Sequence, residues 1–342
     1  MSIHAKNTRF ITCTFKKKTM LKIGVVGAGH FGRFHIQSIL QIPGYTLSGF
    51  YDIDPKRSEE IANEFGIKPY PDYTSLLDDI DVIDIVVPTV SHFECARIAI
   101  KKQKHVFLEK PLTATFHEAE DLLKLANEAQ IKAQAGHIER FNPAFMAARP
   151  YINNPMFIEI HRLSEFTPRS TDVSVIFNLM IHDIDIVLSV VKSNIKRVHA
   201  SGVKVVTDST DIANARLEFD NGCVANITSS RISTGNMRRM RFFQKDTYIN
   251  VDCLNKHAEI MRLKNGGGIE LTGLTDDILN AEDADNFISE ELDINLNNAI
   301  KVELEMFYNA ISGNSEVPVS FEDGYNALKI ATEISDKINK AL

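Results

Sequence analysis

Two residues of this chain could activate a hydroxyl group. Lys110 stands between Glu109 and Pro111, directly after an apolar run that predicts a β-strand. His182 lies in a long apolar segment, where a polar side chain needs a partner or a cavity. A fixed ammonium group can orient a hydroxyl and stabilise an alkoxide, and an imidazole can accept the proton. Together they could oxidise an alcohol if a hydride acceptor lay beside them.

A glycine-rich turn near the start of the chain predicts a site for such an acceptor. A predicted buried strand, Leu21–Val26, leads through this turn into a helix. The turn consists of Gly27, Ala28, Gly29, His30, Phe31 and Gly32. This G-x-G-x-x-G pattern between a strand and a helix is typical of dinucleotide binding, because Gly27 permits the tight turn and Gly29 lets backbone N–H groups approach a pyrophosphate. Gly32 lets the helix pack closely on the strand.

An acidic residue at the end of the next strand supports this interpretation. The predicted strand Thr46–Tyr51 is followed by Asp52, twenty residues after Gly32. A carboxylate at that distance binds the ribose hydroxyls of an adenosine. It would repel the additional phosphate of NADP, and Asp54 would add to the repulsion. The pair of motifs predicts a bound dinucleotide, with NAD favoured over NADP, although Asp52 and Asp54 taken alone would also fit a polar turn.

Length, charge and cysteine usage limit the classes of function. A chain of 342 residues has room for two domains. Its net charge of −7 argues against a nucleic-acid or anionic-membrane partner. Its four cysteines lack C-x-x-C spacing, which predicts reduced thiols in the cytoplasm. No apolar run is long enough to span a bilayer, and we expect a cytoplasmic protein that binds a small molecule.

Residues 1–19 differ from the rest in charge, because they carry five basic residues and no acidic one. The apolar stretch Ile11–Phe15 is too short for a signal-peptide core. We therefore expect a disordered basic tail, and a targeting role is the weaker alternative.

From residue 20 to residue 136, predicted strands and helices alternate, which indicates a parallel, doubly wound sheet with helices on both faces. The strand Asp81–Val87 is followed by a loop that carries Pro88, Thr89 and His92. Loops at this edge of a parallel sheet contact a bound dinucleotide. We expect these three residues to line its nicotinamide side, and for His92 a helix-capping or packing role is equally consistent.

Lys110 follows the next predicted strand, His105–Leu108, at the same edge. Pro111 bars the residue before it from helical φ and ψ, so Lys110 is held in place. A surface lysine in a turn is the alternative, and the predicted cofactor cleft at this edge argues against it. A helix over Phe116–Ala129 and a strand over Ile131–Ala135 complete the first domain.

Residues 137–342 are predicted to form a second, α+β domain. Runs of strands with hairpin turns such as Asp220-Asn221-Gly222 indicate an open, largely antiparallel sheet. The predicted strands are Met156–Leu163, Ile195–Val206, Ile212–Phe219, Cys223–Arg231, Met240–Gln244, Tyr248–Cys253 and Glu259–Lys264. Residues 265–295 are predicted to be an irregular excursion, and helices over about 296–312 and 322–341 end the chain.

A helix predicted over Val173–Lys192 carries His182. It is apolar nearly all round and must be buried. Four polar residues nevertheless share an arc of about 60° on its surface: Asn178, His182, Asp185 and Ser189. Because an unpaired buried polar group costs about 1–3 kcal/mol, we expect this stripe to face the cofactor, with His182 as general base. A self-contained polar network is the alternative, and no metal site is predicted because the H-E-x-x-H spacing is absent.

These motifs resemble the glucose–fructose oxidoreductase / inositol dehydrogenase (Gfo/Idh/MocA) family. The resemblance extends from Met20 to the end of the chain. It implies an N-terminal Rossmann domain, a C-terminal open sheet, homodimers or homotetramers, and NAD(P)-dependent oxidation or reduction of sugars. It also implies that Lys110 and His182 are the catalytic pair, with Asn178 at a position where the family has an aspartate.

Two further stretches resemble the UDP-N-acetylglucosamine 3-dehydrogenases of this family. One covers residues 136–143, and the other runs from residue 169 to residue 185. The resemblance implies a nucleotide-linked amino sugar as substrate, with Arg140 and Arg169 either binding a diphosphate or forming structural ion pairs. Besides the residues above, it implies cofactor contacts from Glu109, Lys110, His137 and Arg140, and substrate contacts from Lys110, Asn142, Arg169, Asn178, His182 and Asp185.

Asn178 departs from the family pattern. An amide can hydrogen-bond an imidazole, but only a carboxylate would raise the pKa of the histidine, typically by about 1–3 units. We therefore expect His182 to be a weaker proton acceptor, with Lys110 carrying more of the reaction. The competing hypothesis is a regulatory protein that binds NAD and a sugar without turnover.

Overall fold

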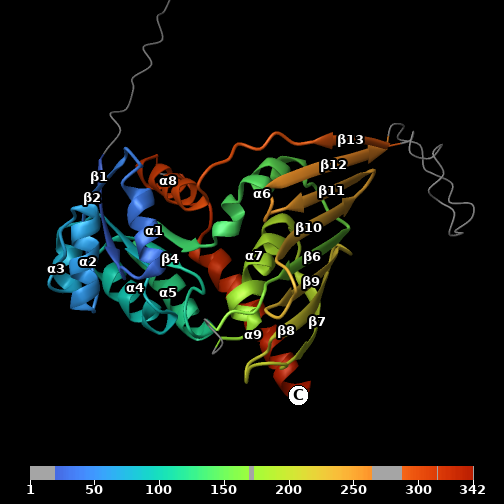
Figure 1. Cartoon of the computed structure of the whole chain (residues 1–342), viewed down its shortest axis with the longest axis horizontal. Helices are drawn as coiled ribbons and strands as arrows, with labels where there is room; N and C mark the ends of the chain where they lie inside the picture. Colours follow the sequence, from blue (N-terminus) through green and yellow to red (C-terminus); the bar gives the residue numbers. More distant parts are fainter. Residues whose placement is uncertain (1–19, 169–172, 264–286, 314, 342) are drawn as a thin grey trace, which may run out of the picture.

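The computed structural model describes residues 20–168, 173–263, 287–313 and 315–341, and it has two lobes (Figure 1). The first lobe is built on a five-stranded parallel sheet, and the second on an eight-stranded sheet. The predicted tail at residues 1–19 and Arg169 lie outside the described residues. In the part of the chain that is described, no helix is both long and apolar enough to cross a membrane.

The sheet of the first lobe has the strand order β2-β1-β3-β4-β5, with all strands parallel. The strands are β1 (Leu21–Val26), β2 (Tyr45–Tyr51), β3 (Val82–Ile85), β4 (His105–Glu109) and β5 (Ala133–Gly136). The chain crosses from one side of β1 to the other between β2 and β3, which creates a switch point where ligands of doubly wound sheets bind. The predicted doubly wound fold is confirmed.

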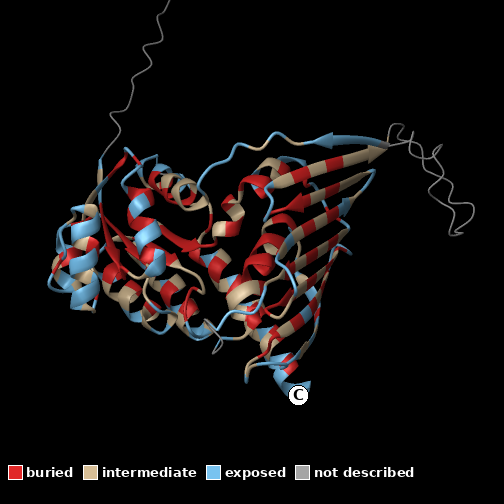
Figure 2. Cartoon of the chain, in the orientation of Figure 1, coloured by how far each residue is buried: buried red, intermediate tan, exposed pale blue. Residues whose placement is uncertain are grey.

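Helices cover both faces of this sheet. They are α1 (His30–Ile39), α2 (Pro55–Phe65), α3 (Tyr73–Asp78), α4 (His92–Lys101) and α5 (Phe116–Ala129). Phe107 and Val82 pack on the side of α1, whereas their neighbours Val106 and Ile83 belong to the core on the opposite side. Because both faces are covered, the strands are buried along most of their length, as Figure 2 shows in red.

The second lobe has the strand order β13-β12-β11-β10-β6-β9-β8-β7, and only β6 and β9 are parallel neighbours. The strands are β6 (Phe157–Leu163), β7 (Ile195–Val203), β8 (Ile212–Phe219), β9 (Val224–Ser230), β10 (Met237–Gln244), β11 (Thr247–Asp252), β12 (His257–Leu263) and β13 (Phe287–Glu291). Figure 2 shows buried and more exposed residues alternating along most of these strands. The pattern arises because helices cover one face of the sheet, and it confirms the predicted open, largely antiparallel sheet.

One strand was not predicted. β13 pairs with β12 at the edge of the sheet, inside the segment predicted to be irregular. Its sequence carries two glutamates in five residues, a charge content that is common in edge strands and hides the strand pattern. The rest of that segment up to residue 286 lies outside the described residues.

The helix that carries His182 also differs from the prediction. It begins with a π-helical turn over Ile176–Met180 and continues as α7 (Ile181–Val190). The wider turn changes the angular spacing, so the positions before Ile181 do not follow the period of 3.6 residues that the prediction assumed. Among the described residues, the remaining α-helices are α6 (Pro143–Ala148), α8 (Ala299–Ser312) and α9 (Phe321–Ala341). Short 3₁₀ turns lie at Thr89–Ser91, Ile138–Phe141 and Arg149–Tyr151.

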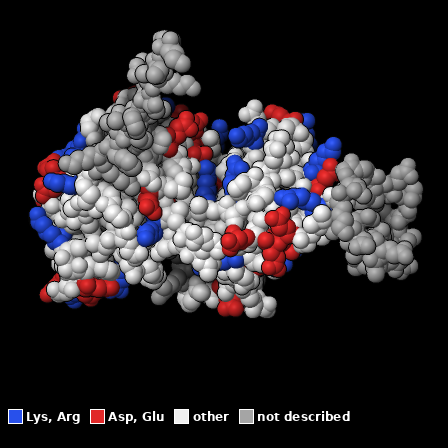
Figure 3. All heavy atoms as spheres, turned by 90° about the horizontal axis from the view of Figure 1, so that it is seen from above, with Lys and Arg blue, Asp and Glu red and all other residues white. Residues whose placement is uncertain are grey.

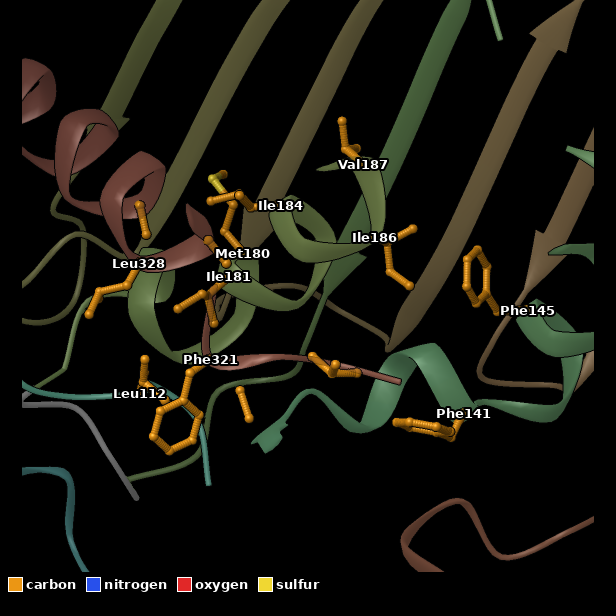
Figure 4. Packing of buried hydrophobic residues seen from close by; sticks show 14 of the residues in the cluster. Leu112, Phe141, Phe145, Met180, Ile181, Ile184, Ile186, Val187, Phe321 and Leu328 are labelled. Atoms are coloured by element: carbon orange, nitrogen blue, oxygen red, sulfur yellow. The ribbon is translucent and has the colours of Figure 1, made fainter. Parts of the chain in front are cut away.

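A continuous apolar core joins the two lobes. In Figure 4, Ile181 and Met180 lie beside Leu328 of α9, and Phe321 lies beside Leu112, the second residue after Lys110. α9 packs against α5 and β5 of the first lobe and against α7 and β7 of the second. Each buried side chain of this size contributes about 1.5–3 kcal/mol, so the core holds the lobe that carries Lys110 against the helix that carries His182.

Candidate active site

A cavity of about 770 Å³ lies between the two lobes, beside the loops that follow β3 and β4. We call it the active-site cavity. The first lobe contributes Phe31, Phe34, Val87, Pro88, Thr89 and Lys110 to its wall, and the second contributes Glu139, Arg162, Phe177, Asn178, His182 and Arg238, among others. Lys110 and His182, which are 72 positions apart in the sequence, thus share one cavity.

The ammonium group of Lys110 reaches across to the second lobe. Its Nζ donates a hydrogen bond to the backbone carbonyl of Asn178 over 2.9 Å. That carbonyl belongs to the π-helical turn, a feature that is frequent at functional sites. Burial, partly opposed by the Glu109 carboxylate, lowers the pKa of Lys110 to about 8. At neutral pH the group is a cation that can donate a hydrogen bond to a ligand in the cavity.

His182 faces the same cavity in its neutral form. Burial, reinforced by the positive charges of Lys110 and Arg162, holds the pKa of His182 well below its ordinary value. Its Nδ1 is buried and has no hydrogen-bond partner among the described residues. In that part of the chain, no hydrogen bond joins it to the Asn178 side chain, because the π-helical turn changes the spacing between the two residues.

The predicted polar stripe on this helix is divided between two environments. Asn178 and His182 line the active-site cavity. Asp185 is buried and accepts two hydrogen bonds of 2.6 Å from Arg140, and Ser189 donates to the carbonyl of Ile186. Half of the stripe faces the cavity, as predicted, and the other half is satisfied inside the protein.

Arg140 and Asp185 form an ion pair outside the wall of the active-site cavity. Their bidentate ion pair is completed by Asp323, 3.2 Å from Arg140. For Arg140, this is the structural ion pair that the sequence left open beside a diphosphate contact. The contacts of Arg140 with cofactor and of Asp185 with substrate stay predictions.

Two more predicted contacts lie away from the cavity. Asn142 caps α6, where its side chain accepts a hydrogen bond from Ala144 N–H and donates one to the carbonyl of Cys253. His137 is buried beside His182, with 6.3 Å between the ring centroids, and neither of its ring nitrogens has a hydrogen-bond partner among the described residues. Neither Asn142 nor His137 is part of the cavity wall. The substrate contact of Asn142 and the cofactor contact of His137 stay predictions.

His92 occupies the cavity wall in a packing role. Its Nδ1 and Nε2 lie 2.9 Å from the carbonyl oxygens of Pro111 and Val87, respectively. The imidazole thus links the loop after β3 to the loop after β4, and its ring nitrogens are not available to a cofactor. Pro88 and Thr89 lie on the wall as predicted.

A buried histidine that sequence reasoning missed supports the Lys110 loop. His35 of α1 lies between two carboxylates, with Nδ1 2.9 Å from Asp84 and Nε2 3.3 Å from Glu109. Glu109 in turn accepts a hydrogen bond from the backbone N–H of Lys110. Although burial opposes the charged form, Asp84 and Glu109 hold the pKa of His35 well above its ordinary value. An aspartate inside the apolar strand β3 was the available signal for this contact.

A second missed cluster fixes α7 from the side of the sheet. Arg162 of β6 is buried and donates to both carboxylate oxygens of Asp183 over 2.7 and 2.8 Å. It also donates to Glu139 over 3.0 Å. Asp183 and Asp185 follow His182 by one and three positions, so ion pairs to Arg162 and Arg140 hold the helix turn that begins at His182. An arginine at an inward position of an alternating strand was the signal for this cluster.

The glycine turn has the geometry that a dinucleotide requires. Gly27 has φ of 90°, and a Cβ atom there would lie 2.7 Å from the carbonyl oxygen of Val86. A side chain at Gly32 would collide with the backbone of Gly27. A Cβ at Gly29 would meet no atom within 4 Å, so it would project into open space at the N-terminus of α1. That open cradle fits a pyrophosphate, whose charge the helix N-terminus favours.

Asp52 lies where an adenosine ribose would be bound. It follows β2, accepts a hydrogen bond of 2.7 Å from Ala28 N–H, and lines a separate hollow of about 470 Å³. Arg57, which sequence reasoning missed, lies 3.2 Å from Asp52 and 3.6 Å from Asp54. The two carboxylates exceed the single cation in charge, and the residues present fit the cofactor.

The cavity and its surroundings carry charges of both signs. Figure 3 shows basic and acidic side chains mixed in small groups over one face of the molecule. Among the described residues, no group of three or more His, Cys, Asp or Glu side chains could hold a metal ion.

Comparison with known proteins decides the family. Residues 21–137 match the profile described as "Oxidoreductase family, NAD-binding Rossmann fold", and residues 134–249 match the GFO/IDH/MocA C-terminal domain. The chain belongs to the Gfo/Idh/MocA oxidoreductase family. The predicted resemblance is confirmed.

Among curated members of the Gfo/Idh/MocA family, the chain is similar to UDP-N-acetylglucosamine 3-dehydrogenase of Acidithiobacillus ferrooxidans. The two are 35% identical over 92% of this chain and 96% of that one. A solved structure of that enzyme superposes with a TM-score of 0.85, at 34% identity over 94% of this chain and 98% of that one. The scyllo-inositol 2-dehydrogenase (NAD(+)) of Bacillus subtilis is 27% identical over 62% of this chain and 68% of that one.

The Gfo/Idh/MocA fold also extends to more distant structures. Levoglucosan dehydrogenase, solved in complex with NADH and levoglucosan, superposes with a TM-score of 0.82 over 95% of this chain and 98% of that one. The identity is 20%, so this likeness concerns the fold.

Proposed function

We propose that this oxidoreductase is an NAD-dependent dehydrogenase that oxidises a secondary hydroxyl of a sugar, specifically of a nucleotide-linked amino sugar such as UDP-N-acetylglucosamine. The observation that carries the proposal is the shared cavity of Lys110 and His182, one from each lobe, at the sheet edge that holds the glycine turn. The choice of sugar rests on the 35% identity to a UDP-N-acetylglucosamine 3-dehydrogenase.

The residues of this chain divide the work as follows. The glycine turn binds the pyrophosphate and Asp52 the adenosine ribose. Bound NAD supplies the hydride acceptor. The Lys110 ammonium donates a hydrogen bond to the substrate oxygen and stabilises its developing negative charge. His182, neutral at pH 7, accepts the hydroxyl proton, and such positioned proton transfer contributes about 10²–10⁴ in rate.

NAD is the proposed cofactor because of the charges around the ribose site. Asp52 and Asp54 carry two negative charges, and Arg57 balances only one of them. The 2′-phosphate of NADP would meet this net negative charge, and an arginine accommodates that phosphate best where no carboxylate competes for it.

A second candidate function follows from Asn178. His182 has no carboxylate partner on its own helix turn, and its pKa lies well below the ordinary value. A protein with so weak a base could bind NAD and sugar as a regulator without turnover. The two functions differ in one observable, the reduction of NAD.

The test is the absorbance at 340 nm after the full chain is mixed with NAD and a panel of sugars. The panel contains UDP-N-acetylglucosamine, UDP-glucose, N-acetylglucosamine, glucose and myo-inositol. The proposal expects NADH to form fastest with UDP-N-acetylglucosamine. Thermal stabilisation by NAD and sugar without NADH formation would favour the regulator, and oxidation of inositol alone would contradict the proposed substrate.

We also propose that the protein is a homodimer or homotetramer that associates through the open face of the eight-stranded sheet. Helices cover the other face, and the residues that alternate with the buried ones on β6 and β10 remain partly exposed. Light scattering coupled to size-exclusion chromatography should give a mass of two or four chains of 38.4 kDa. A monomer at micromolar concentration would contradict this proposal.

A further inference from the structure

A smaller hollow in the second lobe adjoins the active-site cavity. This hollow, which we call the side pocket, has a volume of about 280 Å³ and shares Asn178 and Leu179 with the active-site cavity. Its remaining wall is polar and consists of Ser164, Glu165, Thr167, Arg231 and Asn236. A ligand that lies over Lys110 and His182 and extends past Asn178 would enter the side pocket.

Arg238 lies on the wall of the active-site cavity, two positions after a residue of the side pocket. It is the second residue of β10 and lines the active-site cavity, whereas Asn236, just before the strand, lines the side pocket. Its positive charge acts on His182 strongly enough to contribute to the lowered pKa of that imidazole. Arg238 therefore lies within electrostatic range of the position proposed for the reacting hydroxyl.

Arg238 is less neutralised than the arginine beside it. In the register of β10 and β6, Arg238 stands directly opposite Arg162, an arrangement in which like charges repel. Arg162 donates hydrogen bonds to both carboxylate oxygens of Asp183 and a further hydrogen bond of 3.0 Å to Glu139. Arg238 has only a 3.4 Å contact to the same oxygen of Glu139, and 43% of its side chain is exposed.

Most of the hydrogen-bonding capacity of Arg238 is therefore available to a ligand. A guanidinium group has five N–H donors in a planar fork, and the contact with Glu139 uses one nitrogen, Nη1. Among the described residues, the Arg238 side chain makes no other hydrogen bond or ion pair. By contrast, Arg140 and Arg162 are each held by two carboxylates.

We propose that Arg238 binds the diphosphate of a nucleotide sugar and that the side pocket holds its nucleoside. This inference rests on the proposed function, because the sugar must lie over Lys110 and His182 for the diphosphate to reach Arg238. The planar fork of arginine matches the oxygens of a phosphate. Glu165 would repel a phosphate inside the side pocket but can accept hydrogen bonds from ribose hydroxyls, and the amide of Asn236 suits a base or a ribose.

The first test compares Arg238→Gln with a matched control on the same strand. Arg239→Gln alters the next residue, which points to the opposite face, has 37% side-chain exposure and likewise lies 3.4 Å from one carboxylate, Asp252. With NAD saturating, Arg238→Gln should raise KM for UDP-N-acetylglucosamine about 10- to 100-fold, with a much smaller effect on kcat. Arg238→Lys should recover part of the loss, and Arg239→Gln should match the wild type.

The same variants assayed with N-acetylglucosamine, which has no diphosphate, separate recognition from folding. The inference expects Arg238→Gln to lower kcat/KM for UDP-N-acetylglucosamine at least tenfold more than for this sugar. An equal loss for both sugars would overturn it, as would a KM for UDP-N-acetylglucosamine that does not change in Arg238→Gln.

A binding measurement keeps this inference distinguishable from the proposed function. Calorimetric titration of UDP into the full chain, with NADH saturating so that the dinucleotide site is filled, needs no turnover. UDP should bind to the wild type and at least tenfold more weakly to Arg238→Gln. If no sugar is oxidised but UDP binds in this way, the proposed function fails and the subsite stands. If sugars are oxidised but UDP does not bind, the subsite is wrong and the dehydrogenase stands.

Discussion

The two lobes bring their candidate catalytic residues to the cavity by different means. Lys110 is placed by its chain neighbours, because it follows a strand directly, precedes Pro111, and its own backbone N–H is bound by Glu109. His182 is placed by residues far away in the sequence. The ion pairs of the adjacent Asp183 and Asp185 span 21 and 45 positions to Arg162 and Arg140.

This difference shows which parts of the site depend on long-range packing. In the first lobe, a strand end and a glycine turn place a cation and a pyrophosphate cradle, and the buried His35 and His92 support the Lys110 loop. In the second, a helix must be fixed by buried charges one and three positions after the histidine. Substitutions in the first lobe should therefore affect chemistry more than stability, whereas those beside His182 should affect stability strongly.

The largest effect is expected from Lys110→Met, which removes the ammonium group from the first-lobe side of the cavity. The rate of sugar oxidation should fall by about 10²–10⁴. Binding of NAD, measured by calorimetry, should remain near the wild-type value because the glycine turn and Asp52 are untouched. Lys101→Met, at an exposed position, serves as the control. A loss of activity of less than tenfold would remove Lys110 from the mechanism.

Asp183→Asn tests the second lobe. It breaks a buried ion pair and leaves Arg162 with Glu139 as its remaining carboxylate, so the free energy of unfolding should fall by about 3–5 kcal/mol. The comparison is Glu94→Gln, which breaks an exposed pair with Arg97 in the first lobe and should cost about 0–1 kcal/mol. Urea denaturation measures both, and equal losses would contradict the distinction between the lobes.

Asp52→Asn tests the cofactor side of the first lobe. The amide binds ribose hydroxyls less strongly, so kcat/KM for NAD should fall about 10- to 100-fold. NADP should become a better cofactor relative to NAD, because a negative charge near the 2′-phosphate is removed. Melting temperatures of the free protein provide the control for folding. An unchanged ratio of kcat/KM for NAD and NADP would refute the assignment of Asp52 to the ribose.

The smallest effect is expected from Asn178→Asp. A carboxylate near His182 should raise the pKa of the imidazole, by about 1–3 units. Because this pKa now lies well below its ordinary value, the rise strengthens the base. Turnover at pH 7 should increase about two- to tenfold, and the acid limb of the pH profile should move to higher pH. Unchanged or lower turnover, with the acid limb in place, would contradict this account of Asn178.

Much of the first lobe could be predicted because its signals are local. The glycine turn, Asp52 and the loop after β4 are short patterns whose meaning depends on the strand beside them. The position of Lys110 in the cavity follows from the rule that parallel strands end at one edge. His35 was missed because its partners lie on β3 and β4, and Arg57, whose partners are only three and five positions away, was missed because it stands in no motif.

The second lobe could be predicted in outline but not in its contacts. Alternating strands and hairpin turns specify a sheet, yet nothing in the pattern selects the partner of a buried charge. Arg140, for which a ligand contact was predicted, lies in an ion pair with Asp185, an alternative that the sequence left open. The amino-acid composition of Ile176–Met180 does not indicate a π-helical turn, and this turn alters the spacing between Asn178 and His182.

The most direct test of cooperation between the lobes is a double-mutant cycle on Lys110 and His182. Single-turnover formation of NADH from UDP-N-acetylglucosamine is measured at 340 nm for the wild type, Lys110→Met, His182→Asn and the double variant. If both groups act on one hydroxyl, each single change should lower the rate by about 10²–10⁴, and the double variant should be little slower than the worse single one. Independent, multiplicative losses, or a His182→Asn variant as fast as the wild type, would contradict a shared site.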